Sequence, residues 1–223
     1  MKKIVFLCSG NGGNLKFIDK SIKSGWLPDF RISSVITDRE CAAGKYAQEN
    51  GITGEYVDFS ENHQQTLIEK LLFYNPDIVL TTVHRILNAN VLKVFSGCFF
   101  NLHYSLLPSF SGKIGSKTVQ AALDYGVCLT GATVHHVNQT VDGGKPCVQI
   151  AFPVYSNDSL VDLMNIEFRA GCIALFIAIR SFSWKSGRQS SMTLQILGRD
   201  ALINPGIPLP SDLWSEAFWF SLR

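Results

Sequence analysis

Short apolar runs alternate with segments of helical periodicity along the first hundred residues. The apolar runs have the length of strands, and between them apolar residues recur at the spacing of one helix face. This alternation is typical of a largely parallel sheet joined by right-handed crossovers. The pattern therefore predicts an α/β fold with a Rossmann-like, mostly parallel twisted sheet. The expected strands and helices are 4–8, 15–23, 32–37, 42–50, 55–59, 64–74, 78–82, 89–95 and 98–101.

The pattern changes after residue 101. Two further strand-like runs, 131–137 and 148–154, flank a polar loop. An apolar stripe through 159–182 then predicts a long helix packed on the sheet.

A change in composition near 184–188 marks an expected boundary. It separates a domain of 1–184 from a short C-terminal appendage of 185–223. The appendage carries a strand-like run at 192–197, a Pro-rich turn at 204–210 and an aromatic end.

Size and composition exclude several classes of protein. At 223 residues, with 46% hydrophobic and 17% charged residues, the chain has the composition of an ordered domain with a large core. Its net charge of +2, without a Lys/Arg cluster, argues against a nucleic-acid surface. No apolar run approaches the ~18 residues of a membrane span, and the N-terminal run is too short for a signal peptide. We therefore expect a cytoplasmic protein that binds neither membrane nor nucleic acid.

The six cysteines indicate a reduced compartment and no metal site. They form no C-x-x-C pair and have no metal-ligand spacing. Several lie inside apolar runs, where cysteine is an ordinary small core residue.

Candidate chemistry appears where the apolar run 98–100 ends. Asn101 and His103 are two positions apart, so on a strand their side chains face the same side. An amide that donates to an oxyanion, beside an imidazole that accepts a proton, is the minimum equipment for acyl transfer. Asp142, in a Gly-rich turn further along, supplies a carboxylate that would favour the charged imidazole.

Two segments carry a family resemblance. NLHYSLLPSFSG at 101–112 and TGATVHHVNQTVDGG at 130–144 closely resemble the 10-formyltetrahydrofolate-dependent formyltransferases. The resemblance runs from residue 2 to about 183. It implies that Asn101, His103 and Asp142 are catalytic, that 10-formyltetrahydrofolate is the co-substrate, and that no metal takes part.

The same resemblance implies residues that bind the folate. One stretch follows the strand expected at 78–82, and a second wall precedes Asp142. Because ligands of parallel sheets bind beyond the carboxyl ends of the strands, we expect these loops to converge on one edge. The implied folate-binding residues are Arg85, Ile86, Leu87, Val137, Asn138, Thr140 and Val141.

A Gly-rich loop between the first strand and helix indicates an anion site. Backbone N–H groups at a helix N-terminus favour a phosphate. A dinucleotide fingerprint would require glycine at Leu15, and a Walker loop would require Gly-Lys-Ser/Thr, so both are excluded. On the spacing of the glycines alone, a strand–helix turn that binds no ligand remains the alternative to an anion site. With the resemblance, the residues expected to bind a phosphate-bearing acceptor are Ser9, Gly10, Asn11, Gly12, Gly13, Asn14, Tyr104 and Ser105.

Three departures bear on the identity of the acceptor. Tyr104 stands where the purine-biosynthetic members have proline, and the loop 113–117 lacks their histidines. Gly171 stands at the position of their glutamate, with Glu167 one turn earlier. These departures favour a nucleotide-linked amino sugar, such as a dTDP-amino-dideoxyhexose of surface polysaccharide (O-antigen) synthesis. The alternative is phosphoribosylglycinamide, the acceptor of purine biosynthesis.

Two other classes of function stay open. The same three catalytic groups could deliver water, which would make the chain a folate hydrolase. Alternatively, Tyr104 could disable a non-catalytic folate or nucleotide binder, although retention of Asn101, His103 and Asp142 argues against this.

The C-terminal end concentrates aromatic residues. Exposed to water, such a group would form an apolar patch typical of an interface. A two-fold homodimer is therefore expected, and the alternative is that the tail folds back onto its own domain. The residues concerned are Trp214, Phe218, Trp219 and Phe220.

Overall fold

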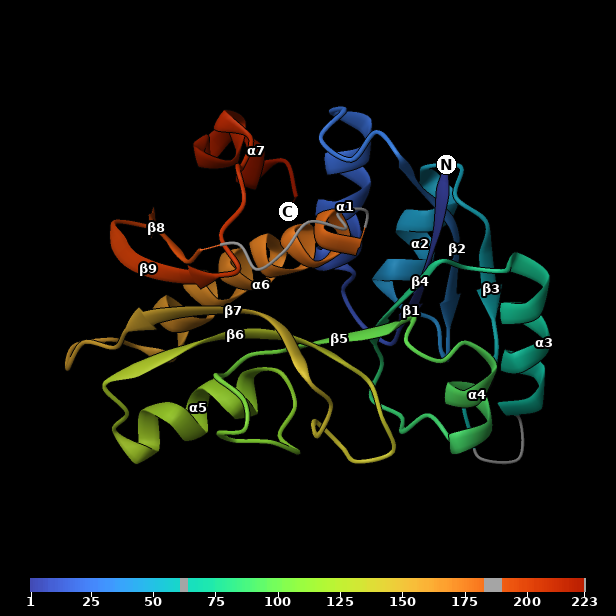
Figure 1. The fold of residues 1–223 in the computed structure, drawn as a ribbon, viewed down its shortest axis with the longest axis horizontal. Coiled ribbons are helices and arrows are strands. Elements are labelled where there is room, and N and C mark those ends of the chain that lie inside the picture. Colours follow the sequence, from blue (N-terminus) through green and yellow to red (C-terminus); the bar gives the residue numbers. More distant parts are fainter. Residues whose placement is uncertain (61–63, 183–189, 223) are drawn as a thin grey trace. The chain divides into compact units, whose positions relative to one another are not determined.

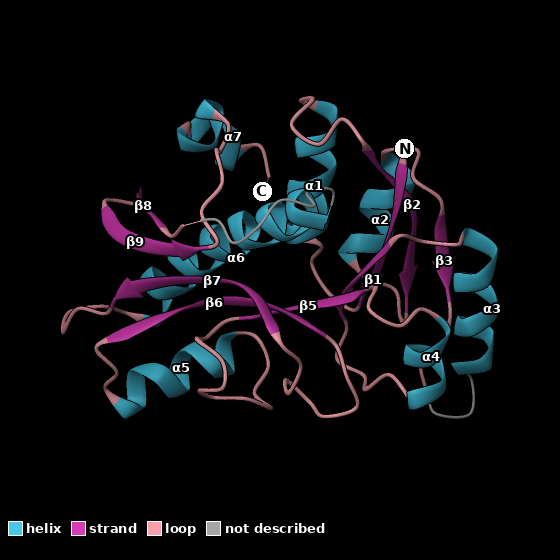
Figure 2. Cartoon of the chain, in the orientation of Figure 1, coloured by secondary structure: helices cyan, strands magenta, loops and turns pink. Residues whose placement is uncertain are grey.

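The chain divides into two units, one of which is built from both ends of the sequence. The computed structural model describes residues 1–60, 64–182 and 190–222. The first unit is Met1–Phe100 with Pro208–Arg223, and the second is Asn101–Ile207. Figure 1 traces both units in sequence colours, and Figure 2 shows helices and strands interleaved along the chain. Among the described residues, no helix is both long and apolar enough to cross a membrane.

The first unit has the parallel sheet that the sequence predicts. β1 pairs in parallel with β2 and with β4, and β2 pairs in parallel with β3. The middle of β1 is fully buried, as expected for a strand covered on both faces. The elements are β1 (Lys2–Cys8), α1 (Gly13–Lys23), β2 (Phe30–Thr37), α2 (Ala42–Glu49), β3 (Gly54–Tyr56), α3 (Gln64–Tyr74), β4 (Ile78–Thr82) and α4 (Ala89–Val94).

β5 (Phe99–His103) begins in the first unit and ends in the second. In the second unit, β6 pairs antiparallel with β7, β7 with β9, and β9 with β8. The long helix α6 packs against β6 and β7, and its apolar residues are buried along most of its length. The elements are α5 (Ser116–Tyr125), β6 (Leu129–His136), β7 (Pro146–Pro153), α6 (Leu160–Phe182), β8 (Met192–Ile196) and β9 (Arg199–Asn204).

The described part of the expected appendage is divided between the two units. β8 matches the expected strand, but β9, which the sequence did not indicate, joins it to β7. Residues from Pro208 onward belong to the first unit. The predicted boundary near 184–188 lies outside the described residues, so the division at 184 stays a prediction.

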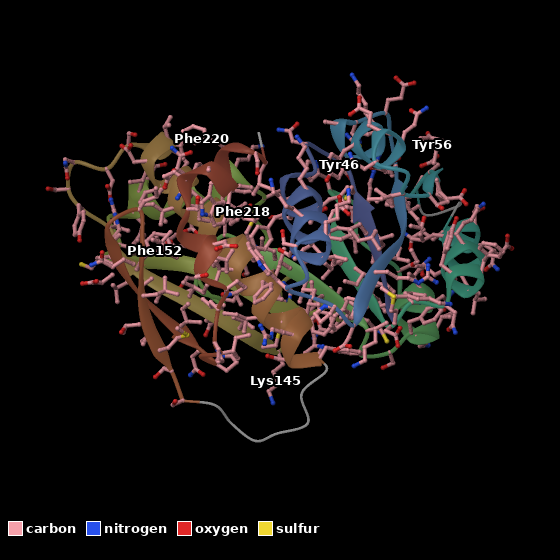
Figure 3. All side chains as sticks on the ribbon, turned by 90° about the horizontal axis from the view of Figure 1, so that it is seen from above. Tyr46, Tyr56, Lys145, Phe152, Phe218 and Phe220 are labelled. Carbon is pink, nitrogen blue, oxygen red and sulfur yellow. The ribbon has the colours of Figure 1, made fainter. Side chains whose placement is uncertain are left out.

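Two of the terminal aromatic residues are buried by the same chain. In α7 (Glu216–Phe220), Phe218 and Trp219 pack on Phe17 of α1, with ring centroids 5.8 and 5.6 Å away. The Trp219 indole N–H donates to the Leu213 carbonyl over 2.8 Å. Phe220, labelled with Phe218 in Figure 3, is 56% exposed. Phe218 and Trp219 therefore follow the alternative in which the tail folds back onto its own chain. The homodimer stays a prediction.

Candidate active site

The end of β5 places Asn101 and His103 in one cluster with Asp142, as the sequence predicts. His103 is buried, and its Nδ1 lies 3.3 Å from Oδ2 of Asp142. The Asn101 amide joins the same group through His135. All of these residues belong to the second unit.

The two nitrogens of His103 have different partners. Nε2 lies 3.2 Å from the carbonyl oxygen of Phe110, whereas Nδ1 faces the Asp142 carboxylate. A carbonyl oxygen only accepts hydrogen bonds, so Nε2 carries a hydrogen in this arrangement. The neutral ring therefore has its lone pair on Nδ1. Nδ1 is the nitrogen that can gain a proton beside the carboxylate.

Asp142 is held in a tight turn between β6 and β7. Its backbone has φ of +52°, a left-handed conformation that aspartate tolerates better than most residues, and Gly143 N–H closes the turn onto the Thr140 carbonyl. The Gly112 N–H donates to Oδ2 over 2.7 Å. The loop after β5 and the loop after β6 therefore meet at this carboxylate.

His135 is a member of the site that the sequence reasoning did not identify. Its ring is buried, with Nε2 3.3 Å from Nδ2 of Asn101 and 3.6 Å from Oδ1 of Asp142. Nδ1 donates to the His136 carbonyl over 2.9 Å, which leaves Nε2 to accept from the amide of Asn101. His135 thus orients the amide.

The pKa shifts follow from this geometry. Burial lowers the pKa of His103, and this outweighs the raising effects of the Asp142 charge and the Phe110 carbonyl. Burial acts to raise the pKa of Asp142, but the adjacent His135 ring, the hydrogen bond from the Gly112 N–H and the nearby His103 lower it overall. The site therefore combines an ionised carboxylate with an imidazole that is readily neutral.

The predicted phosphate loop lies in the first unit, between β1 and α1. Gly12 is the N-cap of α1 with φ of +73°, and it has no side chain to occupy the first N–H groups of the helix. The Ser9 hydroxyl accepts a hydrogen bond from the His84 N–H over 3.2 Å. The loops after β1 and β4 are thus joined within this unit.

The expected folate-binding residues fall in both units. Beside β4, Ile86 is 71% exposed whereas Leu87 is buried, and Arg85 is exposed. In the second unit, Asn138 accepts from the Thr140 N–H over 3.0 Å and so shapes the loop that precedes Asp142. In the same loop Val137 is half-buried and Val141 is 51% exposed. Their contacts with folate stay predictions.

The two acceptor-binding residues expected after His103 differ in how far they are exposed to solvent. Ser105 is buried, and its hydroxyl donates to the Ser109 carbonyl, so its side chain serves the loop. Tyr104 is half-buried and lies against Gly171 of α6. Among the described residues, no group of His, Cys, Asp and Glu side chains is arranged to hold a metal ion.

Comparisons with known proteins identify the family of this chain. A family model described as formyl transferase matches residues 2–176. A phosphoribosylglycinamide formyltransferase of Haemophilus influenzae is 34% identical over 176 residues, covering 73% of this chain and 78% of that protein. A chloroplastic phosphoribosylglycinamide formyltransferase of Vigna unguiculata is 29% identical over 170 residues, which cover 73% of this chain. This chain spans about half (54%) of the length of the Vigna protein.

A solved structure supports the fold. Glycinamide ribonucleotide transformylase 1 from Symbiobacterium toebii has a TM-score of 0.76 and 32% identity, covering 82% of this chain and 87% of that chain. The predicted Rossmann-like α/β class is therefore confirmed.

The predicted acceptor requires a correction. A nucleotide-linked amino sugar was favoured because Tyr104, the loop 113–117 and Gly171 depart from the purine-biosynthetic pattern. The similar proteins are instead named for phosphoribosylglycinamide or glycinamide ribonucleotide. The prediction of a nucleotide sugar and of O-antigen synthesis is wrong, because local departures were given more weight than the similarity of the whole domain.

Proposed function

The chain belongs to the formyl transferase family, whose members draw on 10-formyltetrahydrofolate, and we propose that it formylates the primary amine of phosphoribosylglycinamide. The observation that carries this proposal is the pairing of the His103 imidazole with the Asp142 carboxylate at 3.3 Å, with Asn101 in the same cluster. These groups match the needs of acyl transfer between two nitrogens.

The geometry supports a direct transfer. The neutral amine attacks the formyl carbon, a carbon–nitrogen bond forms, and negative charge develops on the formyl oxygen. Asn101 donates to this oxygen, a type of contact worth about 2.7–4 kcal/mol. His135 supports this role because it holds the amide in one orientation.

His103 supplies the proton transfer. Its Nδ1 accepts the proton that the attacking amine loses, while Nε2–H stays bound to the Phe110 carbonyl. Asp142 stabilises the imidazolium formed in this step. The proton then passes to the folate nitrogen as the bond between it and the formyl carbon breaks. General acid–base catalysis of this kind contributes about a hundred- to ten-thousand-fold.

Formation of the product tests the proposal. Purified protein is incubated with 10-formyltetrahydrofolate and phosphoribosylglycinamide, and the acceptor is analysed by mass spectrometry for the addition of one formyl group. The His103→Ala variant serves as the negative control. Loss of formyl groups from the folate without formylated acceptor would contradict the proposal and favour a hydrolase.

We propose further that the loop from Ser9 to Asn14 holds the acceptor phosphate. Gly12 has the left-handed conformation that glycine favours, and a Cβ there would lie 2.9 Å from Ala43 Cα. We expect Gly12→Ala to raise the acceptor KM and to destabilise the protein by about 1–3 kcal/mol. Gly54→Ala, in β3, is the control outside the loop, because a Cβ there meets nothing within 4 Å. An unchanged acceptor KM in Gly12→Ala would contradict the phosphate assignment.

Assembly is a separate proposal. A two-fold homodimer is supported by Phe220, which is exposed beside the buried Phe218 and Trp219. A mass in solution of twice 24.7 kDa is expected. A monomer at micromolar concentration would contradict it. The cytoplasmic location likewise stays a prediction.

A further inference from the structure

The side chain of Gln64, the first residue of α3, is buried and hydrogen-bonded at both of its polar atoms. Its Nε2 donates to the Ile86 carbonyl over 2.9 Å, and its Oε1 accepts from the Asn88 N–H over 2.6 Å. Nε2 also donates to the Phe59 carbonyl over a longer 3.4 Å. One amide thus bridges two main-chain groups of the loop between β4 and α4, which belongs to the same unit as α3.

The loop from His84 to Asn88 is fixed at both ends. At its start, the His84 N–H donates to the Ser9 hydroxyl over 3.2 Å. At its end, the Asn88 side chain accepts from two N–H groups in the first turn of α4 and caps that helix. Gln64 fixes the stretch between these anchors, because it binds the Ile86 carbonyl from α3, which packs beside α4 (Figure 1).

The middle of this loop carries main-chain donors and acceptors that are not paired within the described part of the chain. They are the N–H groups of Arg85, Ile86 and Leu87 and the carbonyl oxygens of Arg85 and Leu87. Polar main-chain groups of an ordered loop normally find a partner. The loop also follows β4 at the carboxyl end of a parallel strand, where ligands of such sheets bind. These residues are therefore available to a ligand that offers both donors and acceptors.

We propose that Gln64 is a positioning residue for the folate, because its amide holds the main chain at 85–87 in the conformation that pairs with the pteridine ring. This inference rests on the proposed function. The aminopyrimidinone edge of a pteridine has N–H donors beside nitrogen and oxygen acceptors, which main-chain groups held at fixed positions can match. The Ile86 side chain, 71% exposed, offers an apolar surface to the ring. Gln64 itself is 3% exposed, so it acts through the loop and does not touch the ligand.

The role requires an amide and not merely a polar side chain. A donor must face the Ile86 carbonyl while an acceptor faces the Asn88 N–H, and a glutamine supplies both without a charge. Gln64→Glu keeps the acceptor but turns a carboxylate toward the carbonyl. Gln64→Met has a similar length and loses both hydrogen bonds.

Binding of tetrahydrofolate to the full-length protein, measured by titration calorimetry, tests this assignment. Gln64→Met is expected to raise the Kd roughly tenfold, the equivalent of one lost hydrogen bond, and Gln64→Glu at least as much. In steady-state kinetics the KM for 10-formyltetrahydrofolate should rise with it, while the KM for phosphoribosylglycinamide stays within about twofold. This split separates a folate-positioning residue from one that supports the fold in general.

Tryptic cleavage after Arg85 reports on the loop without any assay of activity. Arg85 is exposed, so the rate at which trypsin cuts there depends on how firmly the main chain around it is held. Followed by mass spectrometry of the fragments, this rate should rise several-fold in Gln64→Met. Added tetrahydrofolate should slow the cleavage in the unmodified protein and do so less in the variant.

Two variants of the same helix are the matched controls. Gln65→Met changes the same residue type at the next position, where the side chain is exposed. Ile68→Val removes one methyl group from a buried residue one turn further along α3 and controls for a loss of stability alone. Neither control should change the Kd for tetrahydrofolate or the cleavage after Arg85.

Each outcome bears on one claim. If the unmodified protein binds tetrahydrofolate and formylates phosphoribosylglycinamide, but Gln64→Met has an unchanged Kd, the inference is overturned and the proposed function stands. Equal rises in both KM values, or an equal rise in Kd for Ile68→Val, also overturn it. Should Gln64→Met fail to fold, Gln64→Glu decides by the same measurements. If the unmodified protein does not bind tetrahydrofolate, the proposed function itself fails, and the role of Gln64 fails with it.

Discussion

Two carboxyl groups of the second unit, the half-buried Asp142 and the completely buried Glu167, have opposite tendencies to ionise. Asp142 receives the Gly112 N–H and lies near two imidazoles, and its pKa is lowered despite burial. For Glu167, burial raises the pKa well above its usual value, and the Thr130 hydroxyl and Gly131 N–H oppose this without reversing it. Its Oε2 has no hydrogen-bond partner among the described residues.

The difference shows that the balance between burial and the neighbouring groups decides where the charge lies. Burial alone favours the neutral carboxylic acid at both positions. Asp142 keeps its charge because the Gly112 N–H donates to its Oδ2 and the His103 ring beside it can become positively charged. Glu167 is a structural acid within the α6–β6 packing, whereas Asp142 is equipped to stabilise a positive imidazole.

Removal of the imidazole should give the largest effect. His103→Ala is expected to lower the single-turnover rate of formyl transfer by about a hundred- to ten-thousand-fold. The Kd for tetrahydrofolate, measured by titration calorimetry, should stay within a few-fold. His136→Ala is the matched control, because His136 orients His135 through its main-chain carbonyl, which the variant retains. A near-normal rate in His103→Ala would remove it from the proton transfer.

Removal of the Asp142 charge should give a smaller effect with a defined pH dependence. The Asp142 charge acts to raise the pKa of His103, so Asp142→Asn should lower that pKa further. Because the proposed mechanism requires neutral His103 to accept the proton, the acid limb of the pH–rate profile should move to lower pH. The rate on the plateau should fall roughly tenfold or more, since the imidazolium loses its partner. An unchanged profile would exclude Asp142 from the mechanism.

The side chains of the site could be predicted from the sequence because each left a local pattern. Strand alternation placed Asn101 and His103 on one side, and the Asp-Gly-Gly turn marked Asp142. The groups that hydrogen-bond to these side chains have no recognisable pattern in the sequence. The Phe110 carbonyl and the Gly112 N–H are main-chain groups that every residue carries. The register of β6 against β7 is irregular between Val134 and His135, so strand alternation alone does not indicate the side on which His135 lies.

The sequence predicted the fold where apolar runs were long. The prediction failed where an element is defined by its pairing with strands elsewhere in the chain. The parallel strands of the first unit are buried on both faces and stand out as continuous apolar runs. β9 alternates exposed and buried residues over a short span, and its antiparallel partners β7 and β8 define it. Likewise Phe218 and Trp219 appeared as a surface cluster, because Phe17, which covers them, is some two hundred residues earlier.

The smallest expected effect concerns Glu167 and stability alone. Burial raises the pKa of Glu167 in the folded protein above the value of about 4.3 that a glutamate has in the unfolded chain. Such a group contributes its full stability at pH below the unfolded pKa, and this stability is lost as the pH rises through the folded pKa. Unfolding free energy should therefore fall by up to about 1.4 kcal/mol per pH unit within that window. Glu167→Gln, which cannot ionise, should remove this slope.

Urea unfolding at a series of pH values measures the slope. Glu69→Gln, at an exposed glutamate of α3, should leave it unchanged, since that carboxyl is not buried. Asp142→Asn should act in the opposite direction, because a lowered pKa contributes stability at high pH that is lost on acidification. If Glu167→Gln unfolds with the same pH dependence as the unmodified protein, Glu167 is ionised in the folded state. The contrast with Asp142 would then be wrong.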